Sequence, residues 1–323
     1  MNSKNLELKD IYKAANKIYK IARKTPLYKS VDLSQNFKGE IYYKLEFLQD
    51  TGSFKIRGAS NFSLNLSEGK REKGLVTYST GNHGRAVSHV AKTLKTDAKV
   101  CLSKNVPENK KEGIRKSGGK VIVYGESQDE AKIKAEELNK TESRSIVPPF
   151  DDPHIISGQG TIGLEIMSQL TDLDNILVPL SGGGLISGIA LAVKSINPDC
   201  KVYGVSMDRG AAMYESIKAG KEVEVDEVDT LADSLQGGIL LNNKYTFEMV
   251  KKYVDEIVLV NENEIKEALN YIFYNDHFVV EGASAVGTAA ILSNKIDVSN
   301  QKTVSILTGT NISNEEFISV IQN

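Results

Sequence analysis

The chain has 323 residues, of which 40% are hydrophobic and 25% are charged, as in an ordinary globular protein of about two domains. The 40 Lys and Arg residues nearly balance the 42 Asp and Glu residues, so the net charge is −2. This balance argues against a strong positive field that would attract nucleic acid or an anionic membrane.

The N-terminal segment is charged throughout, and no run of 18 apolar residues occurs in the chain. We therefore expect neither a secretory leader nor a membrane span, and we predict a cytoplasmic protein. Cys101 and Cys200 lie far apart in the sequence and have no paired spacing. They are predicted to be buried thiols, and not a disulfide or metal ligands.

Helices and strands alternate along the chain. Apolar spacing predicts a helix over 6–21, a strand over 40–46 and a helix over 58–66. The next segment predicts strands over 74–79, 98–103, 121–124 and 145–147, with helices between them over 84–94, 107–116 and 128–139. After Pro148-Pro149 the pattern predicts helices over 161–170, 184–195, 243–253, 262–275 and 284–292, and strands over 175–180, 201–206, 256–260 and 303–308.

This alternation indicates βαβ units and an α/β fold with mostly parallel sheets. The strands are too many for one modest sheet, so two sheets are predicted, with a change of composition near Pro148-Pro149.

A glycine run, Ser181-Gly182-Gly183-Gly184-Leu185, follows one predicted strand and opens the next helix. Backbone N–H groups at a helix N-terminus bind anions, so this loop favours a phosphate site. A tight turn that needs glycine only for its dihedral angles is the alternative. Asp208 after the following strand leaves a dinucleotide open as the ligand, although the glycine pattern is imperfect.

Three further segments carry candidate chemistry. Lys55 lies in Gly52-Ser53-Phe54-Lys55-Ile56-Arg57-Gly58-Ala59, where burial, with Arg57 and a helix N-terminus nearby, would lower the pKa of its amine. A surface lysine is the plainer interpretation. Ser79-Thr80-Gly81-Asn82-His83-Gly84 collects groups that suit a carboxylate, with His83 as either a base or a packing residue. Thr308 ends the last strand, at the edge where α/β proteins bind ligands.

In this order and spacing the four segments resemble the fold type II pyridoxal-phosphate (PLP) enzymes, and within them the branch of threonine or serine dehydratases and serine racemases. The resemblance spans nearly the whole chain. It implies two three-layer αβα domains of the tryptophan synthase β type. Residues 1–72 and 148–323 would form the large cofactor-binding domain, and residues 73–147 a small mobile domain.

The resemblance also implies roles for individual residues. Lys55 would bind the cofactor covalently and act as a base, Asn82 would hydrogen-bond the ring hydroxyl, and Thr308 would face the ring nitrogen. Phe54 would lie beside the ring, and the phosphate would be bound by Gly182, Gly183, Gly184 and Leu185. The substrate would be held by Ser79, Thr80, Gly81 and His83, with Thr80 also a catalytic residue.

These roles imply an ammonia-lyase that eliminates water from threonine or serine and releases a 2-oxo acid and ammonia. Two segments, 209–213 and 231–238, are instead similar to the dehydratases of hydroxyectoine breakdown, which leaves a hydroxyectoine-derived amino acid or 3-hydroxyaspartate open as the substrate. Amino-acid racemisation also stays open, although Thr80 replaces the serine that racemases use.

Metal-binding relatives carry carboxylates where this chain has Ser206 and Ala212, so no metal is predicted. The expected partners are a small amino acid and further copies of the chain in a homodimer or homotetramer.

Overall fold

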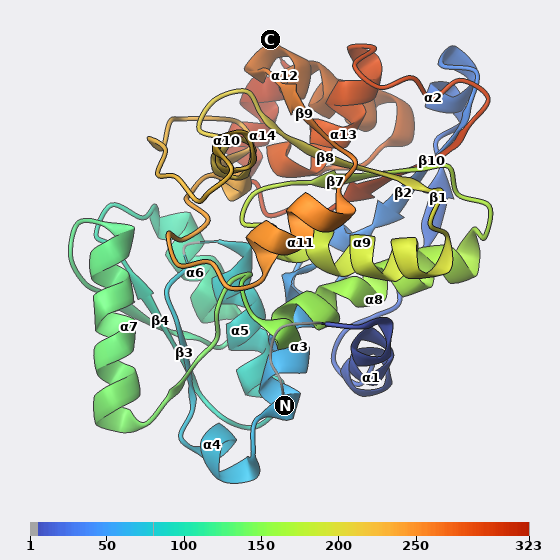
Figure 1. The fold of residues 1–323 in the computed structure, drawn as a ribbon. Helices are drawn as coiled ribbons and strands as arrows, with labels where there is room; N and C mark the ends of the chain where they lie inside the picture. Colours follow the sequence, from blue (N-terminus) through green and yellow to red (C-terminus); the bar gives the residue numbers. More distant parts are fainter. Residues whose placement is uncertain (1–5, 80, 323) are drawn as a thin grey trace.

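The computed structural model (Figure 1) describes residues 6–79 and 81–322, which fold around two separate sheets. The larger sheet has six strands in the order β1-β2-β10-β7-β8-β9. The β1–β2 pair is antiparallel, and the other neighbours in this sheet are parallel. Its strands are β1 (Leu27–Lys29), β2 (Glu40–Leu45), β7 (Asn175–Pro179), β8 (Lys201–Met207), β9 (Glu256–Val260) and β10 (Lys302–Leu307).

The smaller sheet has four parallel strands in the order β5-β4-β3-β6. They are β3 (Leu75–Thr77), β4 (Ala98–Leu102), β5 (Lys120–Val123) and β6 (Ser145–Ile146). All four come from one continuous stretch of the chain, whereas the strands of the larger sheet come from both sides of that stretch. The division into domains at residues 73 and 147 stays a prediction.

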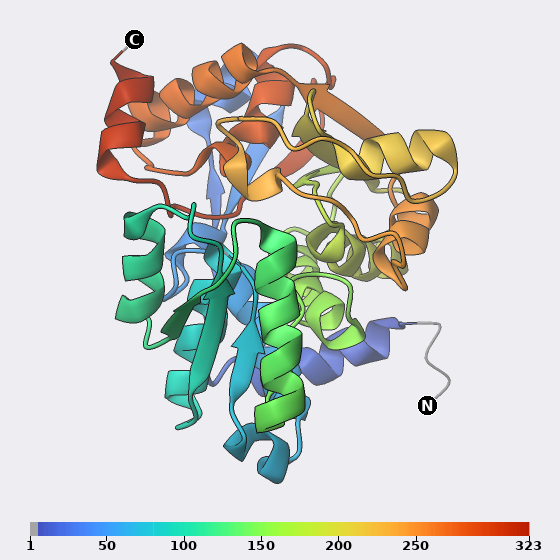
Figure 2. The same cartoon turned by 90° about the vertical axis from the view of Figure 1, so that its left-hand side faces the viewer.

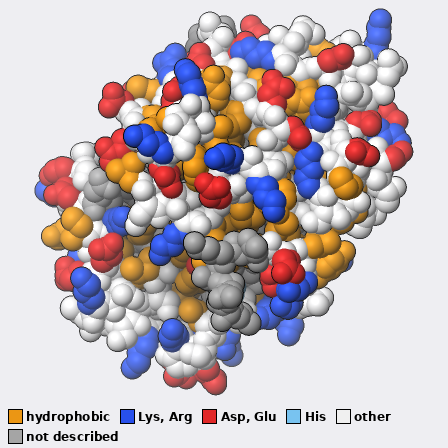
Figure 3. All heavy atoms as spheres, viewed as in Figure 1, with side chains coloured by type: hydrophobic (Ala, Val, Ile, Leu, Met, Phe, Trp, Pro, Cys, Tyr) orange, Lys and Arg blue, Asp and Glu red, His pale blue; other side chains and the backbone are white. Residues whose placement is uncertain are grey.

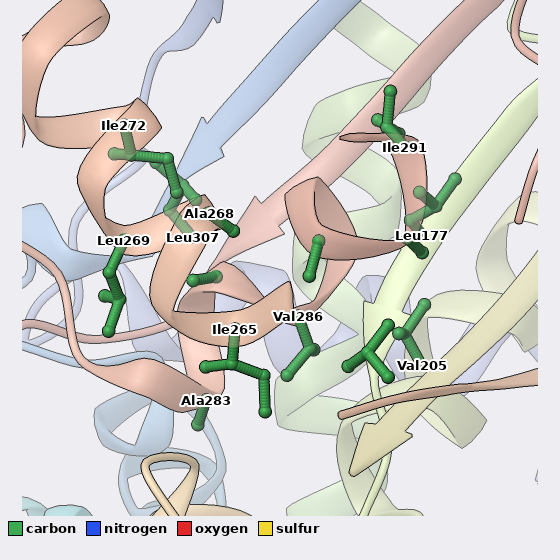
Figure 4. Close-up of a cluster of buried hydrophobic side chains, with 14 of the residues drawn as sticks. Leu177, Val205, Ile265, Ala268, Leu269, Ile272, Ala283, Val286, Ile291 and Leu307 are labelled. Carbon is green, nitrogen blue, oxygen red and sulfur yellow. The ribbon is translucent and has the colours of Figure 1, made fainter. Parts of the chain in front are cut away.

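Helices cover both faces of the larger sheet (Figure 1). On one face lie α12 (Glu262–Tyr271) and α13 (Gly282–Leu292), and on the other lie α8 (Pro153–Gln169) and α9 (Gly184–Ile196). Figure 4 shows the core on the first face, where Leu177 and Val205 from the strands meet Ile265 and Val286 from the helices. All four of these side chains are buried, which fixes the distance between sheet and helices.

The smaller sheet lies between α7 (Gln128–Glu142) and the pair α5 (Asn82–Thr93) and α6 (Glu108–Lys116) (Figure 2). Helix α3 (Lys55–Asn65) packs against both α5 and α8, and it therefore joins the two halves of the molecule. The remaining helices are α1 (Leu8–Ile18), α2 (Val31–Asn36), α4 (Glu68–Glu72), α10 (Ala212–Ala219), α11 (Thr246–Tyr253) and α14 (Asn314–Ile321). Two 3₁₀ turns, η1 (Glu46–Leu48) and η2 (Asp233–Leu235), and a π-helical turn, η3 (Ile272–Asp276), complete the chain.

The two-sheet α/β fold confirms the prediction, but some boundaries differ. Helix α8 begins at Pro153, eight residues before the predicted start, because the Asp152 carboxylate accepts hydrogen bonds from the N–H groups of His154 and Ile155 and so caps it. Helix α3 begins at Lys55 and not at residue 58. The predicted helix over 262–275 is α12 continued by the π-turn η3.

Charges of both signs are interspersed over the face seen in Figure 3. Cys101 and Cys200 are both buried free thiols, as predicted. Among the helices of residues 6–79 and 81–322, none combines the length and apolar character needed to cross a bilayer.

Candidate functional site

The predicted loops meet in one cavity of about 1480 Å³, at the carboxyl ends of strands from both sheets. Asn82 begins α5 after the loop that follows β3, the glycine run follows β7 and leads into α9, and Thr308 directly follows β10. Residues that follow parallel strands gather at the same sheet edge, which is where α/β folds place ligands. The predicted residues that line the cavity are Phe54, Lys55, Ser79, Gly81, Asn82, His83, Gly182, Gly183, Gly184, Leu185 and Thr308. Thr80 lies outside the described residues.

Lys55 is the first residue of α3, and the preceding turn attaches it to the end of β10. Ser53 forms a bridge with Gly309, and the Phe54 N–H donates to the Thr308 carbonyl over 3.0 Å. The Lys55 amine donates to the Pro149 carbonyl over 3.1 Å and lies 5.2 Å from the centre of the Phe54 ring. Burial lowers the pKa of Lys55 to about 8, against a smaller opposing effect of Glu281. About one tenth of this amine is therefore unprotonated and nucleophilic at pH 7, far more than for an ordinary lysine.

Arg57 does not contribute to this shift as the sequence suggested, because its charge is fully engaged elsewhere. Its guanidinium donates to both carboxylate oxygens of Glu46 and to both of Glu165, over 2.6–2.9 Å. Its fifth N–H donates to the Thr161 hydroxyl over 3.1 Å. Arg57 thus fixes α3 to its neighbours, and burial is the main cause of the low pKa of Lys55.

The glycine run forms a cradle at the N-terminus of α9. Gly183 has φ +84°, a conformation that favours glycine. A Cβ on Gly182 would lie 2.5 Å from the Phe150 ring, and one on Gly184 would lie 2.9 Å from the Phe150 backbone. Both positions therefore exclude a side chain, and the N–H groups of this helix terminus border the same cavity as Lys55. The arrangement suits a phosphate group.

Asn82 is held by a network of buried and partly buried polar groups. Its amide donates to Glu281 over 2.7 Å and accepts a hydrogen bond from the Asn311 amide. Asn311 in turn accepts a hydrogen bond from Arg85 over 2.7 Å. Burial, and the nearby charge of Asp233, raise the pKa of Glu281 to about 7, while its hydrogen bond from Asn82 acts in the opposite direction. The network fixes which way the Asn82 amide faces.

His83 and Thr308 are both buried at the cavity wall. The His83 ring nitrogen Nε2 donates to the Val147 carbonyl over 3.0 Å. Burial, reinforced by the charge of Lys55, lowers the pKa of His83 to about 3, so this side chain is neutral at physiological pH. The Thr308 hydroxyl lies 3.0 Å from the Ser284 hydroxyl.

These groups together fit a phosphorylated aldehyde with a pyridine ring. Lys55 supplies an amine that can bond to the aldehyde carbon, the Gly182–Gly184 loop supplies the anion cradle, and Thr308 supplies a hydroxyl for the ring nitrogen. Asp208, which a dinucleotide would need, does not line this cavity. Within residues 6–79 and 81–322, no three His, Cys, Asp or Glu side chains gather in a group that could hold a metal ion.

Sequence reasoning missed several residues of the site, among them Glu281, Ser284, Arg85 and Phe150. Glu281 had one available signal, since it is a lone charge in the apolar run Val279-Val280-Glu281-Gly282-Ala283. Such a charge is rarely buried without a partner. Phe150 and Ser284 gave no such signal, because their importance depends on contacts with segments distant in the sequence.

Comparison with known proteins identifies the family. The family described as "Pyridoxal-phosphate dependent enzyme" matches residues 18–309. A putative threonine dehydratase of Sinorhizobium fredii is 46% identical over 95% of this chain and 93% of its own length. The catabolic L-threonine dehydratase of Escherichia coli is 41% identical over 94% of this chain and 92% of its own length.

The fold agrees with the sequence comparison. The structure of maize serine racemase superposes with a TM-score of 0.92 at 30% identity, and covers 98% of this chain and 97% of that one. The resemblance seen in the four sequence segments is thereby confirmed, as is the type of fold. The chain belongs to the family of pyridoxal-phosphate-dependent enzymes, and its cofactor is pyridoxal 5′-phosphate.

Proposed function

We propose that this protein is an ammonia-lyase that converts L-threonine or L-serine into a 2-oxo acid and ammonia. The observation that carries the proposal is that Lys55, the Gly182–Gly184 loop and Thr308 border one cavity. The names of the S. fredii and E. coli relatives, both threonine dehydratases, support the substrate class.

The cofactor, when bound, stabilises negative charge on the substrate α-carbon. Lys55 would hold the cofactor and, in its unprotonated form, accept the α-proton at Nζ. The C–O bond at the β-carbon then breaks, and the hydroxyl leaves as water together with a proton, equivalent to the one removed from the α-carbon. The enamine that is released takes up one water and gives the 2-oxo acid and ammonia. The pKa of Lys55, about 8, suits a group that gains and loses a proton near neutral pH.

The remaining wall of the cavity would bind and orient the substrate and the cofactor. Ser79 and Gly81 lie at the N-terminus of α5, where helix N–H groups favour the substrate carboxylate. Asn82 would bind the ring hydroxyl, and Phe54 would pack beside the ring. Neutral His83 would hold the loop against the Val147 carbonyl without exchanging a proton. We assign Thr80 a catalytic hydroxyl on the strength of the sequence motif alone.

Two other activities stay as candidates. The maize relative is a serine racemase, so racemisation of the same amino acids is one. A specialised hydroxy amino acid, such as a hydroxyectoine-derived one or 3-hydroxyaspartate, is the other, because Ser234, Gly237 and Gly238 of the 231–238 segment line the cavity.

We further propose a cytoplasmic enzyme that assembles as a homodimer or homotetramer. The edge strand β1 carries the half-exposed Tyr28, and exposed apolar Val31, Leu48 and Val279 lie on neighbouring segments. Light scattering of the purified protein measures the mass of the assembly. A mass of one chain of 35.4 kDa would contradict this part of the proposal.

The activity is tested with the purified protein, its visible absorption and L-threonine. We expect an absorption band of the bound cofactor that changes when threonine is added, together with release of 2-oxobutanoate. Chiral analysis of the remaining substrate separates the candidates, since a lyase leaves L-threonine optically pure and a racemase does not. A cofactor band that no β-hydroxy amino acid alters would overturn the proposed reaction.

A further inference from the structure

A second buried hydroxyl lies behind Thr308. Ser284, in the first turn of α13, is fully buried, and its Oγ lies 3.0 Å from Thr308 Oγ1. Thr308 borders the cavity, whereas Ser284 does not. Within residues 6–79 and 81–322, Ser284 is the hydrogen-bond partner of the Thr308 hydroxyl. The direction of the Thr308 O–H group therefore depends on what Ser284 does with its own proton.

The contacts of Ser284 leave two arrangements of protons. Its Oγ accepts a hydrogen bond from the Gly309 N–H over 2.7 Å and lies 2.8 Å from the Gly309 carbonyl. The single proton of Ser284 can go either to that carbonyl or to Thr308 Oγ1. The Gly309 carbonyl also accepts the Glu281 N–H over 3.1 Å, so it keeps a donor when Ser284 turns away from it.

We propose that Ser284 is a positioning residue that donates its proton to Thr308 Oγ1 and so directs the Thr308 O–H group at the ring nitrogen of the cofactor. This inference rests on the proposed role of Thr308. An unprotonated pyridine nitrogen is a hydrogen-bond acceptor and needs a donor. Thr308 fills that role only while its own proton is not given to Ser284, which requires Ser284 to be the donor of the pair.

The test compares wild type with Ser284→Ala, after each has been freed of cofactor and titrated with PLP. We expect the variant to bind PLP roughly 2- to 12-fold more weakly, as for the loss of one buried hydrogen bond, and to show a displaced absorption band. A PLP analogue in which the ring nitrogen is replaced by C–H should bind equally to both proteins. Equal affinity for PLP itself, or an equal loss for PLP and the analogue, would overturn the inference.

A double-mutant cycle with Thr308→Val separates the effect on Thr308 from an effect on the Gly309 backbone. If Ser284 acts through Thr308, then Ser284→Ala weakens PLP binding in the wild type but not in the Thr308→Val background. A loss that persists in that background would assign Ser284 a merely structural role. Should Ser284→Ala not fold, Ser284→Cys, with its weak thiol donor, provides the same comparison.

The matched control is Ser305→Ala, in β10, the strand that Thr308 directly follows. Ser305 is equally buried, and its hydroxyl makes no hydrogen bond within the described part of the chain. This variant should bind PLP as the wild type does. Failure of the proposed function is recognised separately, because the wild type would then bind PLP and show its absorption band but would not turn over threonine or serine.

Discussion

At the scale of single residues, burial sets the protonation states on which the site depends. It lowers the pKa of Lys55 to about 8 and that of His83 to about 3, and it raises that of Glu281 to about 7. Near neutral pH, Lys55 can therefore exchange a proton, whereas His83 cannot. Lys55 and His83 come from two separate sequence segments that both carry candidate chemistry, and their different roles follow only from what surrounds each of them.

Replacing Lys55 with Ala tests the central assignment. The variant should lose at least about 10³-fold in kcat, as expected when a base and covalent anchor is removed. It should also lose the cofactor absorption band that depends on the amine. Steady-state kinetics and the visible spectrum measure both effects, and circular dichroism checks the fold. Turnover at the wild-type rate would exclude Lys55 as the catalytic amine.

Glu281 should make stability depend on pH. Its pKa rises from 4.5 to about 7 on folding, so between these values the folded protein holds a proton that the unfolded chain releases. The contribution of Glu281 to the free energy of unfolding is fully present below pH 4.5 and is lost as the pH rises through 7. Glu281→Gln resembles the protonated carboxyl and does not titrate. Between pH 4.5 and 8 the wild type should therefore lose about 2–3 kcal/mol more of its free energy of unfolding than this variant.

Urea denaturation of both proteins at several pH values measures this difference. His83 acts in the opposite direction, because its low pKa adds stability as the pH rises from about 3 to 6.5. It is present in both proteins, so the comparison cancels it. Glu126→Gln, at an exposed carboxylate paired with Lys104, is the control. If the free energy of unfolding depends on pH in the same way in the wild type and in Glu281→Gln, then folding does not raise the pKa of Glu281.

At the scale of elements, a buried ionic network determines where α3 lies. It joins Arg57 of α3 to Glu46 of η1 and Glu165 of α8, and Lys44 of β2 donates to Glu165 over 2.7 Å. Each of the four side chains is at most 4% exposed, so each charge needs its partners. Because Lys55 begins α3, the network also fixes the amine relative to the cavity.

Removing Arg57 should therefore destabilise the fold strongly. Arg57→Met leaves Glu46 and Glu165 buried with too few donors, and we expect a loss of about 3–5 kcal/mol in the free energy of unfolding. Urea denaturation measures it. Lys104→Met, which removes a surface partner of Glu126, should change stability by less than about 1 kcal/mol. Similar small losses for both variants would mean that the network is relaxed by water or rearrangement.

The elements that the sequence predicted and those that it missed differ in length and in context. The strands that consist of mostly apolar residues, such as β7 and β8, were predicted within one residue at each end. The three-residue strand β1 and the short helices α2 and α4 were missed, because so few residues give no clear period. Helices α10 and α14, of eight residues each, were also missed.

The site shows the same limit. The segments that carry Lys55, Asn82 and the glycine run were predicted because their chemistry lies within a few consecutive residues. The network that orients Asn82 was not predicted, because Glu281 and Asn311 lie about 200 residues away in the sequence. Hydrogen bonds between such distant segments depend on the tertiary fold and leave no local pattern.

At the scale of the whole molecule, polar contacts join the elements around the smaller sheet to those around the larger one. Lys110 of α6 pairs with Asp233 of η2 over 2.5 Å, and the Arg85 and Asn82 side chains bond to Asn311. The Lys110–Asp233 pair and Asn82 both border the cavity. If residues 73–147 form a small mobile domain, as the resemblance to the family implies, these contacts stabilise its closed position over the substrate.

Lys110→Ala should therefore weaken substrate binding with little change in the chemistry. The ion pair is about one-third exposed, so we expect KM for threonine to rise roughly 1.5- to 5-fold. The value of kcat should stay near that of the wild type, because the reaction proceeds in the closed state in both proteins.

High salt should raise the wild-type KM toward that of the variant, since ions screen an exposed pair. Lys116→Ala, which removes an exposed ion pair with Glu112 on the same helix α6 and outside the cavity lining, should leave KM unchanged. A fall in kcat at constant KM would instead place Lys110 in the chemical step and remove the argument that the pair favours closure.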